Sequence, residues 1–230
     1  SIHVSTYLQR RQMPHYQVFA FLKQPLGKIF FAEGKYTLNI GNLAEGWRAW
    51  KDQSGGGCVL DMGYHFIDLV IWFLGLPDAV YSNLSASARP EQCYDVEDTA
   101  DIHFSYNSGL HGSLIFSRCS ANRQQYLSLL GENGQLLFEN DECRLYSRNG
   151  EKQFQAKSTF SEQKLSANCL DLFAQEILSE NKSKDSHQHL QHAAFIEACY
   201  RSHQFKTAVN PKSLLLAAHQ IPGALQSGGS

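Results

Sequence analysis

The stretch SGGGCVLDMGYHFIDL, Ser54 to Leu69, places three consecutive glycines before an apolar segment that nevertheless contains two aspartates and a histidine. Its other side chains are apolar nearly all round, which is typical of a buried helix. A buried carboxylate without a partner is costly. We therefore predict a helix from about Gly56 to Leu74, ended by Gly75 and Pro77, whose polar side chains are paired.

The polar residues of this segment follow helical spacing. Asp61, His65, Asp68 and Trp72 stand at i, i+4, i+7 and i+11 and share one face of an α-helix. The Cβ atoms of Asp61 and His65 would lie roughly 5–6 Å apart. A carboxylate beside an imidazole stabilises the imidazolium and fixes the ring, which suits a histidine that takes a proton from an alcohol and later returns it. An ion pair with a purely structural role explains the same spacing.

The glycines at the helix entrance predict a close approach of the backbone to another object, either a ligand or a neighbouring domain. They follow a polar loop rather than a strand, so the pattern does not favour a phosphate cradle. Asp61 is expected near the positive end of the helix, where a negative charge is stabilised.

Composition excludes several classes of protein. The 230 residues include 43% hydrophobic and 18% charged residues, with a net charge of −2 and no basic block, so we expect no nucleic-acid partner. The longest apolar run, 66–74, is broken by Asp68 and is shorter than the roughly 20 residues of a membrane span. We expect no secretory signal and no membrane contact. Six cysteines without a C-x-x-C pair favour free thiols in a reducing cytoplasm over a zinc site or a disulfide framework.

The periodicity along the chain predicts both helices and strands. We expect a helix over 13–24, one or two strands over 28–40, a polar loop over 41–54, an antiparallel meander of six to eight strands over 78–157, and two closing helices at 166–180 and 189–204. No G-x-G-x-x-G opens a βαβ unit anywhere in the chain.

The central segment also resembles a known family. GWRAWKDQSGGGCVLDMGYHFIDLVIWFLGLPDAVYSNL, residues 46–84, is similar to the hallmark of the glucose–fructose oxidoreductase / inositol dehydrogenase / MocA family: W-R, S-G-G-G, D-x-x-x-H-x-x-D, a hydrophobic helix and G-x-P. QRRQMPHYQVFAFLKQPLGKIFFAEGKY at 9–36 resembles the family's R-R-x-x-P helix and following strand, and FIEACYRSHQ at 195–204 resembles a helix near its C-terminus. The resemblance covers essentially the whole chain.

The resemblance implies an α+β fold with a large, mostly antiparallel β-sheet and helices packed on one face. Residues 1–230 would form a single substrate-binding and oligomerisation domain, and the sheet face would join subunits of a homo-oligomer. Family members also have an N-terminal Rossmann domain, with the dinucleotide glycines and a Glu-Lys-Pro motif whose lysine is catalytic. Neither motif occurs in this sequence, so we expect that domain to be absent from the chain.

The resemblance also assigns roles to residues. Asp61 and His65 match the family's active-site pair: His65 would exchange a proton with the substrate as hydride moves to or from NAD or NADP, and Asp61 would orient it. Arg11 and Arg48 match positions near the substrate, and Asp68 is assigned to structure. The cofactor-binding residues would lie in the absent domain, so we expect this chain alone to bind no cofactor tightly and to be inactive.

We therefore predict the substrate-binding and assembly domain of an NAD(P)-dependent oxidoreductase acting on a sugar, cyclitol or polyol. One alternative is a non-catalytic binding or assembly module of the same fold. Another is metal-dependent hydrolysis by Asp61 and His65 or by the cluster His187, His189 and His192. For that cluster a solvated helix start is the better interpretation, and no metal site is predicted.

Overall fold

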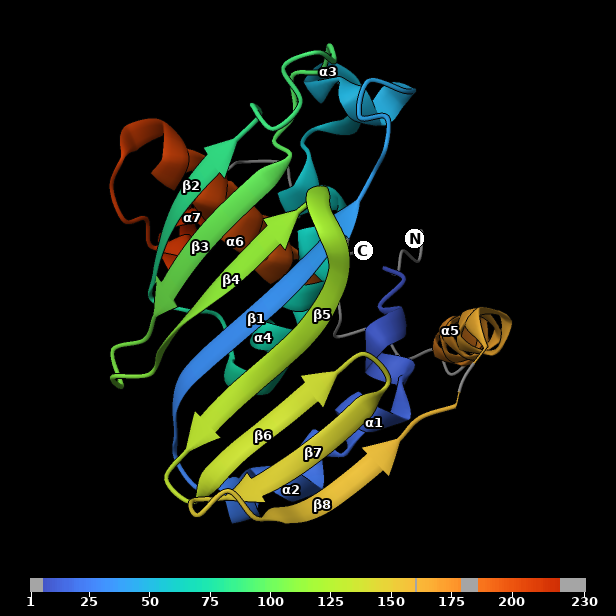
Figure 1. The fold of residues 1–230 in the computed structure, drawn as a ribbon, viewed down its shortest axis with the longest axis vertical. Coiled ribbons are helices and arrows are strands. Elements are labelled where there is room, and N and C mark those ends of the chain that lie inside the picture. Colours follow the sequence, from blue (N-terminus) through green and yellow to red (C-terminus); the bar gives the residue numbers. More distant parts are fainter. Residues whose placement is uncertain (1–5, 160, 179–185, 220–230) are drawn as a thin grey trace, which may run out of the picture.

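A computed structural model describes residues 6–159, 161–178 and 186–219 (Figure 1). Its centre is an eight-stranded sheet in the order β2-β3-β4-β1-β5-β6-β7-β8. The strands are β1 (Ile29–Asn39), β2 (Ala79–Ser85), β3 (Thr99–Ser105), β4 (His111–Ser117), β5 (Cys119–Gly131), β6 (Gly134–Glu139), β7 (Glu142–Ser147) and β8 (Lys152–Lys157).

The sheet is not the continuous meander that the sequence predicts over 78–157. β1, from the N-terminal part of the chain, lies between β4 and β5, and it runs parallel to β4 and antiparallel to β5. All other neighbouring strands are antiparallel. The expected α+β class with a mostly antiparallel sheet is confirmed, but β1 interrupts the expected meander between β4 and β5.

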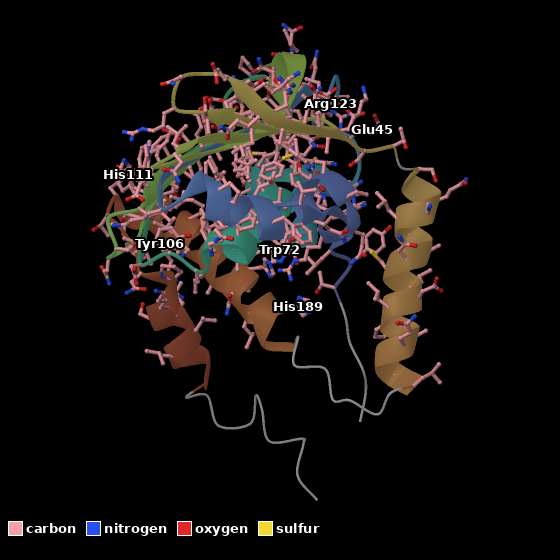
Figure 2. The ribbon with its side chains drawn as sticks, turned by 90° about the horizontal axis from the view of Figure 1, so that it is seen from below. Glu45, Trp72, Tyr106, His111, Arg123 and His189 are labelled. Atoms are coloured by element: carbon pink, nitrogen blue, oxygen red, sulfur yellow. The ribbon has the colours of Figure 1, made fainter. Side chains whose placement is uncertain are left out.

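The helices lie on one face of this sheet, as Figure 2 shows. They are α1 (Pro14–Gln17), α2 (Phe19–Leu26), α3 (Lys51–Ser54), α4 (Tyr64–Leu74), α5 (Glu162–Leu178), α6 (Ser186–Phe205) and α7 (Pro211–His219), with the 3₁₀ turns η1 (Gln9–Gln12) and η2 (Trp47–Ala49). The core lies between this layer and the sheet and includes Phe66 of α4, Phe116 of β4 and Phe195 of α6, all fully buried. Helix α5 stands beside the layer and packs against η1.

Several helices differ from the expectation. The helix predicted over 13–24 is divided into α1 and α2, and Pro25 lies inside the last turn of α2 rather than after it. The polar loop 41–54 contains η2 and α3. The chain closes with α5, α6 and the additional helix α7 rather than with two helices. Pro211 is the first residue of α7, where its missing N–H costs no hydrogen bond.

The opening segment forms a continuous helical stretch that changes type. A π-helical turn, η3 (Val59–Gly63), precedes α4, and Gly75 ends α4 as predicted. By length and composition Lys51–Leu74 is apolar enough to cross a membrane, but 67% of its apolar window is buried inside the domain. Most of this stretch therefore belongs to the core of the domain.

Candidate functional site

The close approach that the three glycines predict is to the chain itself. A Cβ on Gly57 would stand 2.0 Å from the carbonyl oxygen of Glu97, and one on Gly56 would stand 2.0 Å from the hydroxyl of Tyr200. The Glu97 carboxylate accepts hydrogen bonds from the Tyr200 hydroxyl and from the amide of Val59, at 2.9 and 3.0 Å. The expectation of a ligand or a second domain at this point is wrong, because Glu97 and Tyr200 fill the space.

The π-helical turn changes the surroundings of Asp61. In a π turn the hydrogen bonds run from i to i+5, so residues four apart no longer stack as in an α-helix. The carboxylate of Asp61 accepts a hydrogen bond from Nη2 of Arg118 at 3.0 Å and stands 3.7 Å from Nε of Arg48. The direct Asp61–His65 pair that helical spacing predicts is not formed within the described residues. The Asp61 side chain is 40% exposed and belongs to an arginine cluster.

Arg118 was missed by sequence reasoning. It directly follows β4, at the end of the alternating segment HGSLIFSR. A charged residue at this point interrupts the apolar alternation, and this interruption is the sequence signal that could have identified Arg118. Its side chain is 4% exposed, whereas that of Arg48 is 58% exposed and lies over the ring of Trp47 at 4.6 Å. Arg48 is therefore at the surface, where a ligand has access. Arg118 is buried and forms an ion pair with Asp61.

His65 lines a polar cavity of about 410 Å³. The cavity opens between the sheet, η1 and the start of α5, and its polar lining includes Arg10, Tyr36, Arg123, Gln125 and Asn140. Neither ring nitrogen of His65 forms a hydrogen bond within the described part of the chain. The imidazole is thus available to a small molecule in this cavity.

The charge state of His65 follows from burial and from one arginine. Burial lowers the pKa of His65 from 6.5 to about 4, and the positive charge of Arg10 acts in the same direction. Asp68 and then Asp61 oppose this lowering of the pKa. His65 is therefore neutral near pH 7 and has a lone pair that can accept a proton.

Arg10 was also missed, although the sequence shows it beside Arg11. It is 6% exposed and stacks over the rings of Tyr36 and Phe66, 5.2 and 5.0 Å from their centroids. Its Nη1 donates a hydrogen bond to the Tyr16 hydroxyl at 3.2 Å. Two consecutive arginines thus face different surroundings, and Arg10, not Arg11, lines the cavity with His65.

Arg11 instead holds Asp68 in the interior. Nε and Nη2 of Arg11 donate to the Asp68 carboxylate at 3.0 and 2.7 Å, and Nε2 of His192 is 2.8 Å from the same oxygen. These contacts place Asp68 in the structural role that was expected, and they lower its pKa against the opposing effect of burial. His192 is 1% exposed, so the interpretation of its cluster as a solvated helix start is wrong for this residue. The side chain of His187 lies outside the described residues.

The described residues contain no group of three or more His, Cys, Asp and Glu side chains placed to hold a metal ion. All six cysteines are free thiols, in agreement with the sequence.

The comparisons with known proteins identify the domain type. Residues 23–137 match the model of the GFO/IDH/MocA C-terminal domain. No curated protein matches the sequence.

Solved structures share the fold at low sequence identity. A levoglucosan dehydrogenase in complex with NADH and levoglucosan has a TM-score of 0.77 and 18% identity, over 88% of this chain and 65% of that one. An aldose-aldose oxidoreductase from Caulobacter crescentus complexed with glycerol has a TM-score of 0.76 and 19% identity, over 88% and 62%. An oxidoreductase from Agrobacterium radiobacter in complex with NAD⁺, L-tartaric acid and magnesium has a TM-score of 0.71 and 14% identity, over 90% and 65%. This chain therefore spans about two thirds or less of the length of these enzymes.

Proposed function

Because the chain belongs to the GFO/IDH/MocA family through its C-terminal domain, we propose that it is the substrate-binding and assembly part of an NAD(P)-dependent oxidoreductase. Its substrate would be a sugar, cyclitol or polyol, and a preceding Rossmann domain would complete the enzyme. Support comes from the enzymes of the same fold, whose structures contain NADH with levoglucosan, or glycerol. The observation that carries the proposal is the neutral, part-buried His65 on the wall of a polar cavity.

This chain does not fit the dinucleotide itself. At the triple-glycine run 55–57, Tyr200 fills the space beside Gly56 and Glu97 fills the space beside Gly57, so that this backbone offers no cradle for a pyrophosphate. NAD or NADP enters the proposal only as the hydride partner of the substrate, bound by the other domain. No tight binding of either cofactor to the isolated chain, and no turnover by it, is expected.

We assign the proton transfer to His65. The neutral imidazole accepts the proton of a substrate hydroxyl during oxidation and returns it during reduction, which is general acid–base catalysis. Asp61 is too engaged with Arg118 and Arg48 to orient the ring directly, so its proposed role is to favour the imidazolium through its charge. Arg48, at the exposed end of that cluster, is the proposed substrate contact at the rim. Arg11 would act on the site only by holding Asp68.

The test is His65→Ala in the protein that carries both domains. General acid–base catalysis contributes about 10²–10⁴-fold, so kcat should fall by that factor while the protein stays folded. His111→Ala removes an exposed histidine on β4 and is the matched control. Activity of His65→Ala within a few-fold of the unmodified enzyme would reject the role of His65.

The competing function is a non-catalytic binding or assembly module. It is favoured by the ion pairing of Asp61 with arginines instead of with His65. The upstream coding sequence separates the two: a dinucleotide fingerprint and a Glu-Lys-Pro motif support the enzyme, and their absence supports the module. The enzyme would be a cytoplasmic homo-oligomer joined through the open face of the sheet, consistent with six free thiols.

A further inference from the structure

The cavity beside His65 carries positive charge without a matching negative charge. Arg10 and Arg123 are the cationic residues that line it, and no carboxylate of the described residues does. Gln125 and Asn140 add neutral amides to the lining. Figure 2 shows Arg123 in the sheet layer, on the side of the molecule where α5 stands. A concave site lined by charges of one sign focuses the electrostatic potential and attracts ligands of the opposite charge.

Arg10 is the more informative of the two arginines. Its guanidinium has five donors. In the described chain Nη1 donates to Tyr16, whereas the buried Nε has no acceptor. The rings of Tyr36 and Phe66 stabilise the charge from its faces, but aromatic faces provide no acceptor in the guanidinium plane. A charge that is 94% buried with so few acceptors is costly unless an anion pairs with it.

Arg123 reaches the same wall of the cavity from β5. Its guanidinium carbon lies 6.0 Å from the centroid of the Tyr36 ring, and that of Arg10 lies 5.2 Å from it. Arg123 forms no ion pair within the described residues. The guanidinium groups of Arg10 and Arg123 therefore both lie near the Tyr36 ring, and both residues line the cavity with His65.

We propose that this cavity is an anion subsite, and that the enzyme's substrate is an acidic sugar or polyol whose carboxylate is held by Arg10 and Arg123 while a hydroxyl faces His65. The planar fork of arginine matches a carboxylate in a bidentate manner. A volume of about 410 Å³ lies within the range of about 300–1,000 Å³ for small-molecule sites. The hydroxyl at His65 rests on the proposed function, whereas the anion subsite requires no redox step.

The test is calorimetric titration of the 230-residue chain at low salt with three probes that share a pyranose ring: D-glucuronate, D-glucose and D-glucose 6-phosphate. D-Glucuronate should bind at least about tenfold more tightly than D-glucose, because a hydrogen bond to a charged group is worth that much or more. Arg123→Gln, at an exposed position, should lose about tenfold in affinity for D-glucuronate. Arg10→Lys keeps the charge, loses the fork and should also weaken binding.

Arg148→Gln is the matched control, because Arg148 is exposed in the turn between β7 and β8 and does not line this cavity. The affinity of the Arg148→Gln variant for D-glucuronate should equal that of the unmodified chain. Equal binding of D-glucuronate and D-glucose, no binding of D-glucuronate, or an unchanged affinity in Arg123→Gln overturns the subsite. Preference for D-glucose 6-phosphate overturns the carboxylate and assigns the arginines to a phosphate. Should Arg10→Lys fail to fold, Arg123→Gln decides alone.

The two proposals fail separately. A chain that binds D-glucuronate through Arg123, in a protein whose turnover is insensitive to His65→Ala, keeps the subsite and rejects the proposed function. Turnover that depends on His65 with no preference for acidic sugars does the reverse.

Discussion

Asp68 is the residue whose surroundings are most demanding. Its carboxylate is 1% exposed and is held by Arg11 from η1 and by His192 from α6, so it joins three elements in one buried network. Removing one partner of a buried ion pair leaves the other charge uncompensated, and the usual cost is about 3–5 kcal/mol. The network therefore links η1, α4 and α6 within the helix layer.

We expect Asp68→Asn to lower the free energy of unfolding by about 3–5 kcal/mol in urea titrations near pH 7. Because the native pKa of Asp68 is lowered, its stabilisation is present above the ordinary value of 3.8 and is lost as the pH falls through the native value. Asp68→Asn should therefore flatten the loss of stability below pH 3.8. Asp101→Asn, which removes an exposed partner of His103, should change stability by less than about 1 kcal/mol. A near-neutral Asp68→Asn contradicts the network.

The partners of Asp68 could not be predicted from the sequence. The apolar surroundings of Asp68 indicated correctly that its carboxylate needs a partner. Arg11 lies 57 positions away and His192 lies 124 positions away, so nothing local identifies either of them. The same limit applies to Arg10, whose burial is decided by the packing of Tyr36 and Phe66 around it.

Among the elements, the entrance to α4 departs furthest from a regular helix. The sequence predicted the apolar stretch and its end at Gly75 well, because apolar periodicity and a terminal glycine are local signals. It did not predict the π-helical turn Val59–Gly63, whose entrance packs against segments distant in the sequence. Gly57 approaches the backbone of Glu97, and the Cβ position of Gly63 lies 2.7 Å from the ring of Phe116.

Gly57→Ala tests whether this packing sets the entrance. A Cβ at this position would stand 2.0 Å from a backbone oxygen, which cannot move as a side chain can, so the entrance must shift. We expect a loss of about 1–3 kcal/mol in the free energy of unfolding, the usual cost of overpacking. Gly41→Ala is the control, because a Cβ there meets nothing within 4 Å. If both variants unfold at the same urea concentration, the close approach to Glu97 has no energetic importance.

At the scale of the whole molecule the sheet has two unlike faces. The helices cover one face, and the other carries no helix of the described chain (Figure 2). Periodicity predicted an antiparallel meander of six to eight strands over 78–157, and β2 to β8 lie within that range. The insertion of β1 between β4 and β5 could not be predicted from the sequence, because parallel pairing of strands more than 70 residues apart leaves no local pattern.

The uncovered face makes the proposed homo-oligomer testable. Ile115 of β4 is 39% exposed, and it alternates with the buried Leu114 and Phe116, so it points away from the helices. If two copies join through this face, Ile115→Glu places a charge in each apolar contact and should convert the dimer to a monomer in light scattering at micromolar concentration. Phe205→Glu introduces the same charge on α6, where Phe205 is 63% exposed, and should leave the dimer intact. A monomeric unmodified chain, or dissociation by both variants alike, would exclude the sheet face as the interface.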